Sequence, residues 1–265
     1  MSRIIVVTSG KGGVGKTTTT SNLGAAIAQQ NRSVALIDAD FGLRNLDLLL
    51  GLEERVVYTA IDVLAGECRL AQALVKDKRL KGLVLLPAAQ NRNKESVQPE
   101  QMKKIATALA KGYDYILIDC PAGIELGFRN AISAAEEALI VTTPEVAAVR
   151  DADRVIGLLE AEGVNKINLI VNRVKPWMVE ENKMMSVEDV LELLGVPLIG
   201  VVPDDEKVIV ATNKGEPLVL GEYDSIPARA YVNIARRLEG EKVPFLDLMA
   251  NQGNLLTRLR RMFGG

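Results

Sequence analysis

The chain has 265 residues, a formal net charge of −2, two cysteines and no histidine. A hydrophobic fraction of 48% excludes disorder as the overall state, and the length suits one large α/β domain or two small ones. The charge gives no global reason to bind nucleic acid, and acid–base chemistry must use carboxylates, lysines, tyrosines or water. The distant Cys68 and Cys120, the absence of a signal segment and the lack of a long apolar run favour a cytoplasmic protein.

Short apolar runs alternate with helix-length segments along the chain. We expect strands at residues 4–7, 34–37, 83–86, 115–118, 138–142, 167–171 and 198–202. We expect helices at residues 21–29, 100–110, 146–162, 186–194 and 226–238. Continuous apolar runs are typical of strands buried on both faces of a parallel sheet. The order therefore predicts an α/β fold, a doubly wound and mostly parallel sheet flanked by helices, with its ligand at the carboxyl ends of the strands.

A phosphate-binding loop follows the first predicted strand. Residues 10–17 read GKGGVGKT, in which Gly15 gives backbone room, Lys16 binds the β/γ-phosphates and the Thr17 hydroxyl binds Mg²⁺. A glycine-rich turn that merely ends a strand is the alternative, but the strand, loop and helix occur in the required order. The predicted nucleotide contacts of this loop are Gly10, Lys11, Gly12, Gly13, Val14, Gly15, Lys16, Thr17 and Thr18.

Three aspartates end predicted strands near this loop. Asp119 follows an apolar strand, as does the usual outer holder of Mg²⁺, although a helix N-cap is the common alternative for such a residue. Asp38 and Asp40 are one residue apart and point the same way on an extended chain. We expect Asp40 to orient the attacking water and Asp38 to assist the metal or the fold; turn chemistry is the alternative for both.

These segments together resemble the deviant Walker A ATPases of the ParA/MinD family. The resemblance rests on residues 11–18, 38–47 and 119–123, covers essentially the whole chain, and is closest to the members that place the bacterial division site. It implies a P-loop NTPase fold, slow ATP hydrolysis, and ATP/ADP and Mg²⁺ as cofactors. It also implies an ATP-held homodimer in which Lys11 acts catalytically with Lys16 and Asp40 by reaching the partner's phosphates. A solvated loop cation is the alternative for Lys11.

Two later strand ends resemble the base-reading side of the family's site. Asn172 and Arg173 follow one predicted strand, and Pro203 and Asp204 follow the next. An asparagine amide can pair with an adenine edge because it has both a donor and an acceptor. An asparagine after a strand is more commonly a turn residue, so both interpretations stay open.

The last residues form an amphipathic pattern. We divide the chain into an ATPase domain at 1–240, a connector at 241–253 and a membrane-targeting helix at 254–265. The apolar stripe and its flanking arginines are Leu255, Leu256, Leu259, Met262 and Phe263, with Arg258, Arg260 and Arg261. Helices docked on the core or on a partner share this pattern. One tail binds anionic lipid marginally because ordering the segment opposes its burial, whereas two tails in a dimer gain by effective concentration.

The resemblance also implies a regulatory cycle and its partners. The expected protein is reversibly peripheral on the inner face of the plasma membrane, recruits a MinC-like division inhibitor and is released by a MinE-like activator of hydrolysis. Arg44 and Asn45 follow Asp40 and are the candidate partner surface, with plain loop polarity as the alternative.

Three other classes share the P-loop. A ParA-like partition ATPase would ride on DNA and show a basic surface, which the net charge does not favour. An iron–sulfur carrier would bridge its dimer with paired cysteines, and Cys68 and Cys120 are better explained as small buried residues. A small-molecule kinase would need a second substrate pocket, which nothing in the sequence marks.

Overall fold

The computed structural model describes residues 2–41, 43–89, 97–221 and 225–248. Its strands are β1 (Arg3–Thr8), β2 (Val34–Asp38), β3 (Val75–Lys76), β4 (Leu83–Leu86), β5 (Tyr115–Asp119), β6 (Glu137–Thr142), β7 (Lys166–Val174) and β8 (Leu198–Pro203). Its α-helices are α1 (Lys16–Gln29), α2 (Leu46–Leu49), α3 (Ala60–Leu64), α4 (Leu70–Ala73), α5 (Pro99–Leu109), α6 (Leu126–Ile132), α7 (Val146–Ala161), α8 (Pro176–Glu180), α9 (Val187–Leu194), α10 (Glu206–Asn213) and α11 (Ile226–Leu238). Two 3₁₀ turns are η1 (Glu53–Arg55) and η3 (Leu218–Leu220).

The strands form one sheet in the order β3-β4-β2-β5-β1-β6-β7-β8. The pairs from β4 to β8 are parallel, and the short β3 is antiparallel to β4. The chain starts in the middle at β1, builds one half of the sheet outward, returns to β5 and then builds the other half. The predicted doubly wound, mostly parallel sheet is therefore confirmed, and the loop after β1 lies near the point where the strand order reverses.

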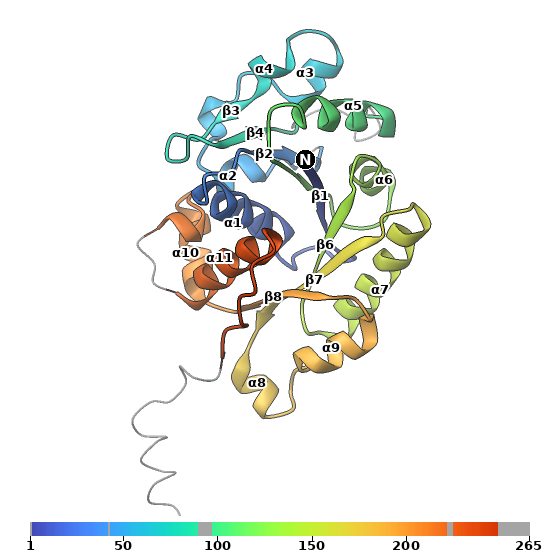
Figure 1. The fold of residues 1–265 in the computed structure, drawn as a ribbon, viewed down its shortest axis with the longest axis vertical. Coiled ribbons are helices and arrows are strands. Elements are labelled where there is room, and N and C mark those ends of the chain that lie inside the picture. The colour runs from blue at the N-terminus through green and yellow to red at the C-terminus, as the bar shows by residue number, and fades with distance from the viewer. Residues whose placement is uncertain (1, 42, 90–96, 222–224, 249–265) are drawn as a thin grey trace, which may run out of the picture.

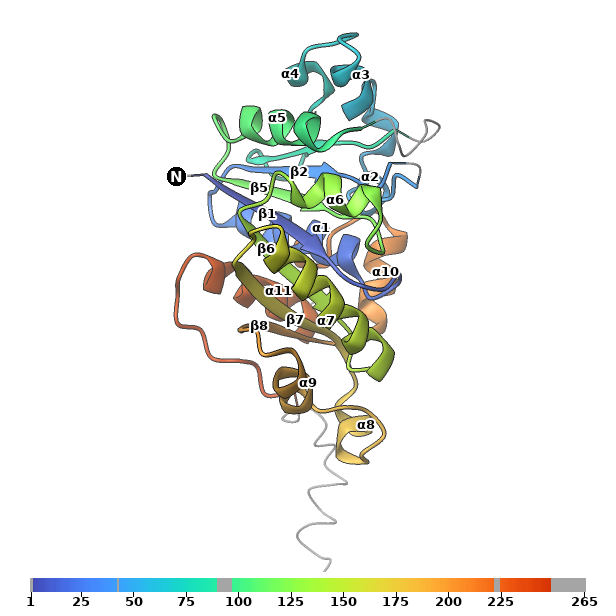
Figure 2. The same ribbon diagram turned by 90° about the vertical axis from the view of Figure 1, so that its right-hand side faces the viewer.

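Helices cover both faces of the sheet (Figures 1 and 2). One buried cluster packs α5, α6 and α7 against the sheet through residues such as Met102, Phe128 and Val155. The other packs α1 and α11 against the opposite face through Leu23 and Ile234. Strands β2, β5 and β6 are buried at every position, which explains why the residues between their ends are continuously apolar rather than alternating.

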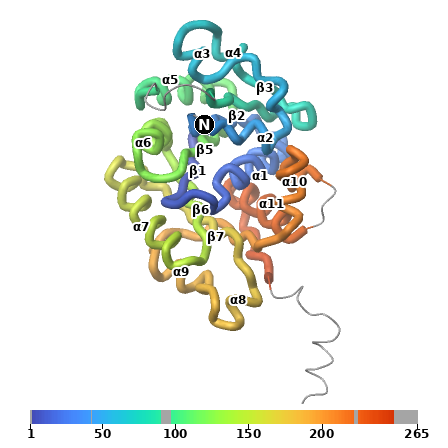
Figure 3. The backbone as a smooth tube through the Cα atoms, turned by 180° about the vertical axis from the view of Figure 1, so that it is seen from behind, coloured from blue at the N-terminus to red at the C-terminus, as the bar shows by residue number. Residues whose placement is uncertain are grey.

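Seven strands and five longer helices match the predicted segments to within a few residues. The sequence prediction missed the short elements β3, α2, α3, α4, α6, α8 and α10. Several of them lie at the outer part of the sheet beyond β2 and β4, toward the top of the tube in Figure 3. Four of the missed helices, α2, α3, α4 and α8, have only four or five residues and hold too little apolar periodicity to be recognised from the sequence.

The described chain stays packed on the domain after α11. Arg237 donates hydrogen bonds to the carbonyls of Val243, Pro244 and Ile199, and its guanidinium lies 4.1 Å from the ring centroid of Phe245. The first part of the predicted connector at 241–253 therefore lies against β8 and α11. The predicted membrane helix at 254–265 lies outside the described residues, and no helix within them has the length and apolar character that crossing a bilayer requires.

Candidate nucleotide-binding site

The loop after β1 has the backbone of a phosphate cradle. Gly13 and Gly15 have φ angles of 78° and 99°, in the left-handed region that favours glycine. A Cβ on Gly10 would overlap the backbone of Asp151 in α7, so this position also requires glycine. Helix α1 then begins at Lys16, with the sequence KTTT in its first turn. The positive end of its dipole therefore faces the loop, where an anion is favoured.

The Lys16 side chain is buried behind this loop, and no carboxylate among the described residues is bonded to it. Its Nζ donates to the Ser9 hydroxyl at 2.9 Å, and that hydroxyl donates to the Lys11 carbonyl at 2.7 Å. Burial lowers the pKa of Lys16, against the opposing charges of Asp119, Cys120 and Asp40. A buried ammonium held by one neutral hydroxyl is suited to bind phosphate oxygens, which supply charge-assisted hydrogen bonds.

Asp119 ends β5 next to the phosphate loop, because Val7 and Asp119 are opposite each other in the β1–β5 register. The Thr20 hydroxyl donates to its Oδ1 at 3.0 Å. Burial raises the pKa of Asp119 to about 6, although hydrogen bonds from Thr17 and Thr20 and the charge of Lys16 lower it. The carboxylate thus lies beside the Thr17 hydroxyl, in surroundings that a divalent cation would stabilise.

Asp38 is fully buried at the end of β2, opposite Asp119 in the β2–β5 register. Burial raises its pKa to about 8, and the nearby Asp119 adds to this increase. Its two oxygens accept hydrogen bonds from the backbone N–H groups of Asp40 at 3.0 Å and Leu46 at 3.2 Å. In this structure Asp38 holds the ends of the 39–46 loop, and its predicted contact with the metal stays a prediction. Asp40 is half-buried at the start of that loop.

A magnesium ion fits the residues around Asp119 on the chemistry of the donors. No cluster of three histidine, cysteine or acidic residues with metal-binding geometry occurs in the described parts of the chain. Mg²⁺ typically needs only one or two protein carboxylates, because nucleotide phosphates and water complete its shell. The hydroxyl of Thr17 and the carboxylate of Asp119 supply that small set of hard oxygen donors.

Lys11 projects from the exposed part of the loop. Its side chain is 46% exposed, and its Nζ lies 3.6 Å from Glu145 Oε2, just before α7. Exposed pairs of this kind contribute little to stability. Lys11 is therefore available to leave Glu145 for a more strongly charged partner.

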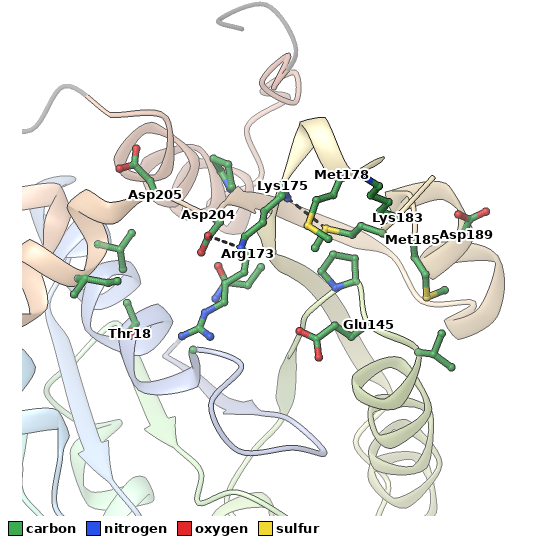
Figure 4. A pocket seen from close by; sticks show the side chains of 18 of the residues that line it. Thr18, Glu145, Arg173, Lys175, Met178, Lys183, Met185, Asp189, Asp204 and Asp205 are labelled. Atoms are coloured by element: carbon green, nitrogen blue, oxygen red, sulfur yellow. Dashed lines mark hydrogen bonds and ion pairs between the residues drawn. The ribbon is translucent and has the colours of Figure 1, made fainter. Parts of the chain in front are cut away.

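A groove of about 1050 Å³ extends from the phosphate loop across the ends of β7 and β8 (Figure 4). Gly15, Thr18, Pro203 and Asp204 line it, together with residues of α8, α9 and α10. This location brings together the predicted phosphate and base sides of the site. The groove is large enough for a nucleotide, since small-molecule pockets typically measure roughly 300–1,000 Å³.

Asn172 and Arg173 are adjacent in this groove but differ in their contacts. Asn172 is buried, and its Nδ2 donates to the carbonyl of Val14 at 2.8 Å. Arg173 is exposed and lines the groove. The amide donor that was expected to read a base is thus engaged with the phosphate loop in this structure.

The two residues of the candidate partner surface, Arg44 and Asn45, also differ in their contacts. Arg44 has a φ of 45°, donates to Asp47 Oδ2 at 2.6 Å and reaches the Glu53 carbonyl at 3.2 Å, with 14% of its side chain exposed. Asn45 is exposed at the start of α2, and Leu43 beside it is 60% exposed. Arg44 therefore stabilises its own loop, whereas Asn45 and Leu43 present side chains outward.

Ser9, Thr20 and Glu145 contact the predicted site residues but carry no prediction from the sequence. Ser9 directly precedes the glycine pattern, and Thr20 ends the run of threonines that opens α1, so both lie within two residues of the motif that was recognised. Glu145 meets Lys11 only because α7 starts beside the loop in the folded chain. A local sequence pattern carries no signal for such a distant contact.

The glycine loop, the buried lysine and the carboxylate at the end of a neighbouring strand define a P-loop nucleotide-binding protein. The model of the CobQ/CobB/MinD/ParA nucleotide-binding domain family matches residues 5–218. A septum site-determining protein MinD of Synechocystis is 68% identical over 266 residues, covering 100% of both chains. A chain of the MinC:MinD cell division protein complex of Aquifex aeolicus superimposes with a TM-score of 0.87 at 49% identity, covering 93% of this chain and 99% of that one.

A second solved relative is a complex with a nucleotide. The septum site-determining protein MinD of Pyrococcus horikoshii, complexed with Mg-ADP, is 33% identical with a TM-score of 0.82, covering 95% of this chain and 98% of that one. The chain therefore belongs to the MinD septum site-determining proteins of the CobQ/CobB/MinD/ParA nucleotide-binding family.

Proposed function

We propose that this chain is an ATPase switch of division-site placement, which dimerises with ATP, binds the inner face of the membrane and leaves it after hydrolysis. The observation that carries the proposal is the buried Lys16 ammonium, which among the described residues is held by the Ser9 hydroxyl, beside the open N-terminus of α1. This arrangement favours the phosphates of a nucleotide, and the relative bound to Mg-ADP supports the same ligand here.

Within this proposal the residues of the phosphate loop and the neighbouring aspartates have separate roles. Backbone N–H groups of residues 10–18 surround the phosphates, and Lys16 binds the β/γ end. Thr17 and Asp119 hold Mg²⁺, which would neutralise charge on the phosphate oxygens. Asp40 orients the attacking water from the loop that Asp38 holds in place. The chain has no histidine, so a carboxylate is the natural residue for this step.

Lys11 supplies the link between nucleotide and dimer. It lies on the exposed side of the loop and has a weak partner in Glu145. In the proposed dimer, Lys11 leaves Glu145 and reaches the phosphates held by the second copy. Two anionic sites facing each other repel, and a lysine from each side offsets that repulsion in a place that excludes water.

The tail supplies the link between dimer and membrane. Its apolar residues and arginines at 254–263 suit shallow insertion into an anionic bilayer, and pairing two tails raises the binding by effective concentration. The MinC:MinD complex of Aquifex aeolicus supports a MinC-like inhibitor as a partner, and we assign that partner to the ATP form. A MinE-like activator that speeds hydrolysis would complete the cycle.

Co-sedimentation with anionic liposomes tests this function. With ATP and Mg²⁺ the full chain should sediment with the vesicles, and with ADP it should stay in the supernatant. A chain ending at Gly253 should still bind ATP but should not sediment. ATP-dependent sedimentation of the shortened chain would refute the role of the tail, and ATP-dependent binding to nonspecific DNA instead of liposomes would favour a partition ATPase.

A further inference from the structure

The end of β7 contains an irregularity at the edge of the nucleotide groove. The β7–β8 register shifts between Asn172 and Val174, so Arg173 is an extra residue in the strand. Its φ of 57° lies in the left-handed region, which is costly for a side chain with a Cβ. Bulges of this kind change the direction of a side chain, and strained residues cluster at functional sites.

Because of the bulge, the side chains of Asn172 and Arg173 point in different directions. The Asn172 amide turns to the phosphate loop, where it donates to the Val14 carbonyl and lies so close to Gly15 that a Cβ there would overlap it. Arg173 turns into the groove instead. In Figure 4 its side chain extends from β7 between Thr18 and Glu145.

Arg173 differs from the other cationic side chains of the groove in its contacts. Across the ranges that the structure describes, its guanidinium makes no hydrogen bond or ion pair, whereas the neighbouring groove lysines Lys175 and Lys183 pair with Asp204 and Glu181. An arginine held in a strained backbone and left unpaired in a groove is suited to bind an anion, because its fork matches phosphate geometry.

The position of Arg173 along α1 indicates which part of a nucleotide it meets. Lys16 and Thr17 serve the β/γ end of the phosphates, and Thr18, one residue further along, lines the groove near Arg173. The Tyr231 hydroxyl lies 3.4 Å from Thr19 Oγ1. Burial raises the pKa of Tyr231 to about 12, whereas the hydrogen bond with Thr19 and the charge of Arg173 lower it. The guanidinium is thus near the first turns of α1, beyond the β/γ end.

We propose that Arg173 binds the α-phosphate of the nucleotide and does not read its base. The proposal rests on the proposed nucleotide function and deepens it. Arg173 would contribute to affinity for any nucleoside diphosphate or triphosphate, and base preference would come from other groups along β8 and α10.

Calorimetric titration with ADP and with GDP, each with Mg²⁺, tests the assignment. Arg173→Gln should weaken binding of both nucleotides about tenfold, since charge-assisted hydrogen bonds are the strong ones, and should leave the ADP-to-GDP affinity ratio within about twofold of the parent. Arg236→Gln is the matched control, because it removes an arginine that lies outside the groove and pairs with Glu241, and it should bind ADP as the parent does.

Arg173→Gly separates binding from folding. Glycine accepts the left-handed backbone, so this variant should melt at or above the temperature of the parent and still bind ADP about as weakly as Arg173→Gln. Parental ADP affinity in Arg173→Gln would overturn the proposal, and so would a collapse of the ADP-to-GDP ratio, which would assign Arg173 to the base. Failure of the parent chain to bind either nucleotide would instead refute the proposed function.

Discussion

The charged residues at the carboxyl edge of the central sheet, where the parallel strands end, differ in their partners from those at the amino edge, where the strands begin. At the carboxyl edge, burial raises the pKa values of Asp38 and Asp119 to about 8 and about 6, and the Lys16 ammonium is bonded to a hydroxyl. At the amino edge, Arg3 donates to both oxygens of Glu137 at 2.7 and 2.6 Å, and Lys166 lies 2.9 Å from the same carboxylate. Arg3, Glu137 and Lys166 are thus joined by ion pairs, whereas in the described part of the chain Lys16, Asp38 and Asp119 form no ion pair with one another.

The pKa of Glu137 shows what this pairing does. Burial tends to raise it, but hydrogen bonds from Arg3 and Lys166 outweigh burial, and the pKa is lowered. The same edge includes the Arg32–Glu239 pair at 2.6 Å. These charges of the amino edge are therefore neutralised by partners within the chain. The carboxyl edge is stabilised when an anion reaches Lys16 and a cation reaches Asp119, which is what a magnesium nucleotide supplies.

Asp119→Asn should have the largest effect among the substitutions that test this difference between the two edges. The amide keeps the size of the side chain but cannot hold Mg²⁺ as the carboxylate does, so ATP turnover should fall by about 100-fold or more. The nucleotide-free protein should be no less stable at pH 8, because the change removes a buried charge that is unfavourable above pH 6. Phosphate release and thermal melting measure the two effects, and a marked loss of stability with full turnover would contradict the contrast.

The pH dependence of the nucleotide-free protein should be set by Asp38. A carboxyl whose pKa is about 8 when folded and lower when unfolded binds its proton more tightly in the folded state. The stability from this group is present at low pH and is lost as the pH rises toward 8, at up to about 1.4 kcal/mol per pH unit. Urea unfolding between pH 6 and pH 8 measures this slope.

Asp38→Asn is the control for this slope. It removes the titrating group and keeps a side-chain oxygen that can accept a hydrogen bond from the loop. The slope should become clearly flatter in this variant. An equally steep slope would show that other groups cause it.

Glu137→Gln should have the smallest effect, and on stability alone. At pH 7 it should reduce the free energy of unfolding by about 1–2 kcal/mol, because Arg3 loses its charged acceptor in a partly buried place. The pKa of Glu137 is lowered by folding, so its contribution is lost as the pH falls below its ordinary value, and parent and variant should converge in acid. ADP affinity should stay within about twofold of the parent. A larger loss would show that the amino edge of the sheet influences nucleotide binding at the carboxyl edge.

Much of this architecture could be predicted from local patterns. The apolar runs placed seven strands, and the glycine loop with Asp119 placed the phosphate site, because each depends on neighbouring residues or on a common strand-end geometry. The bulge at Arg173 could not be predicted, since it depends on how β7 pairs with β8.

The internal role of Arg44 and the ion pair between Lys11 and Glu145 also needed the structure. Both depend on the course of the chain in space. The amino edge was missed because Arg3, Glu137 and Lys166 are far apart in the sequence.

The central claim is that Lys11 turns nucleotide binding into dimerisation. The most direct measurement is the solution mass of Asp40→Ala and of Asp40→Ala with Lys11→Ala, in ATP and in ADP, by size-exclusion chromatography with light scattering. With ATP, Asp40→Ala should have the mass of two 28.7 kDa chains, and with ADP the mass of one. The double variant should remain a single chain with either nucleotide while still binding ATP. A double variant that dimerises with ATP as well as Asp40→Ala would contradict the account.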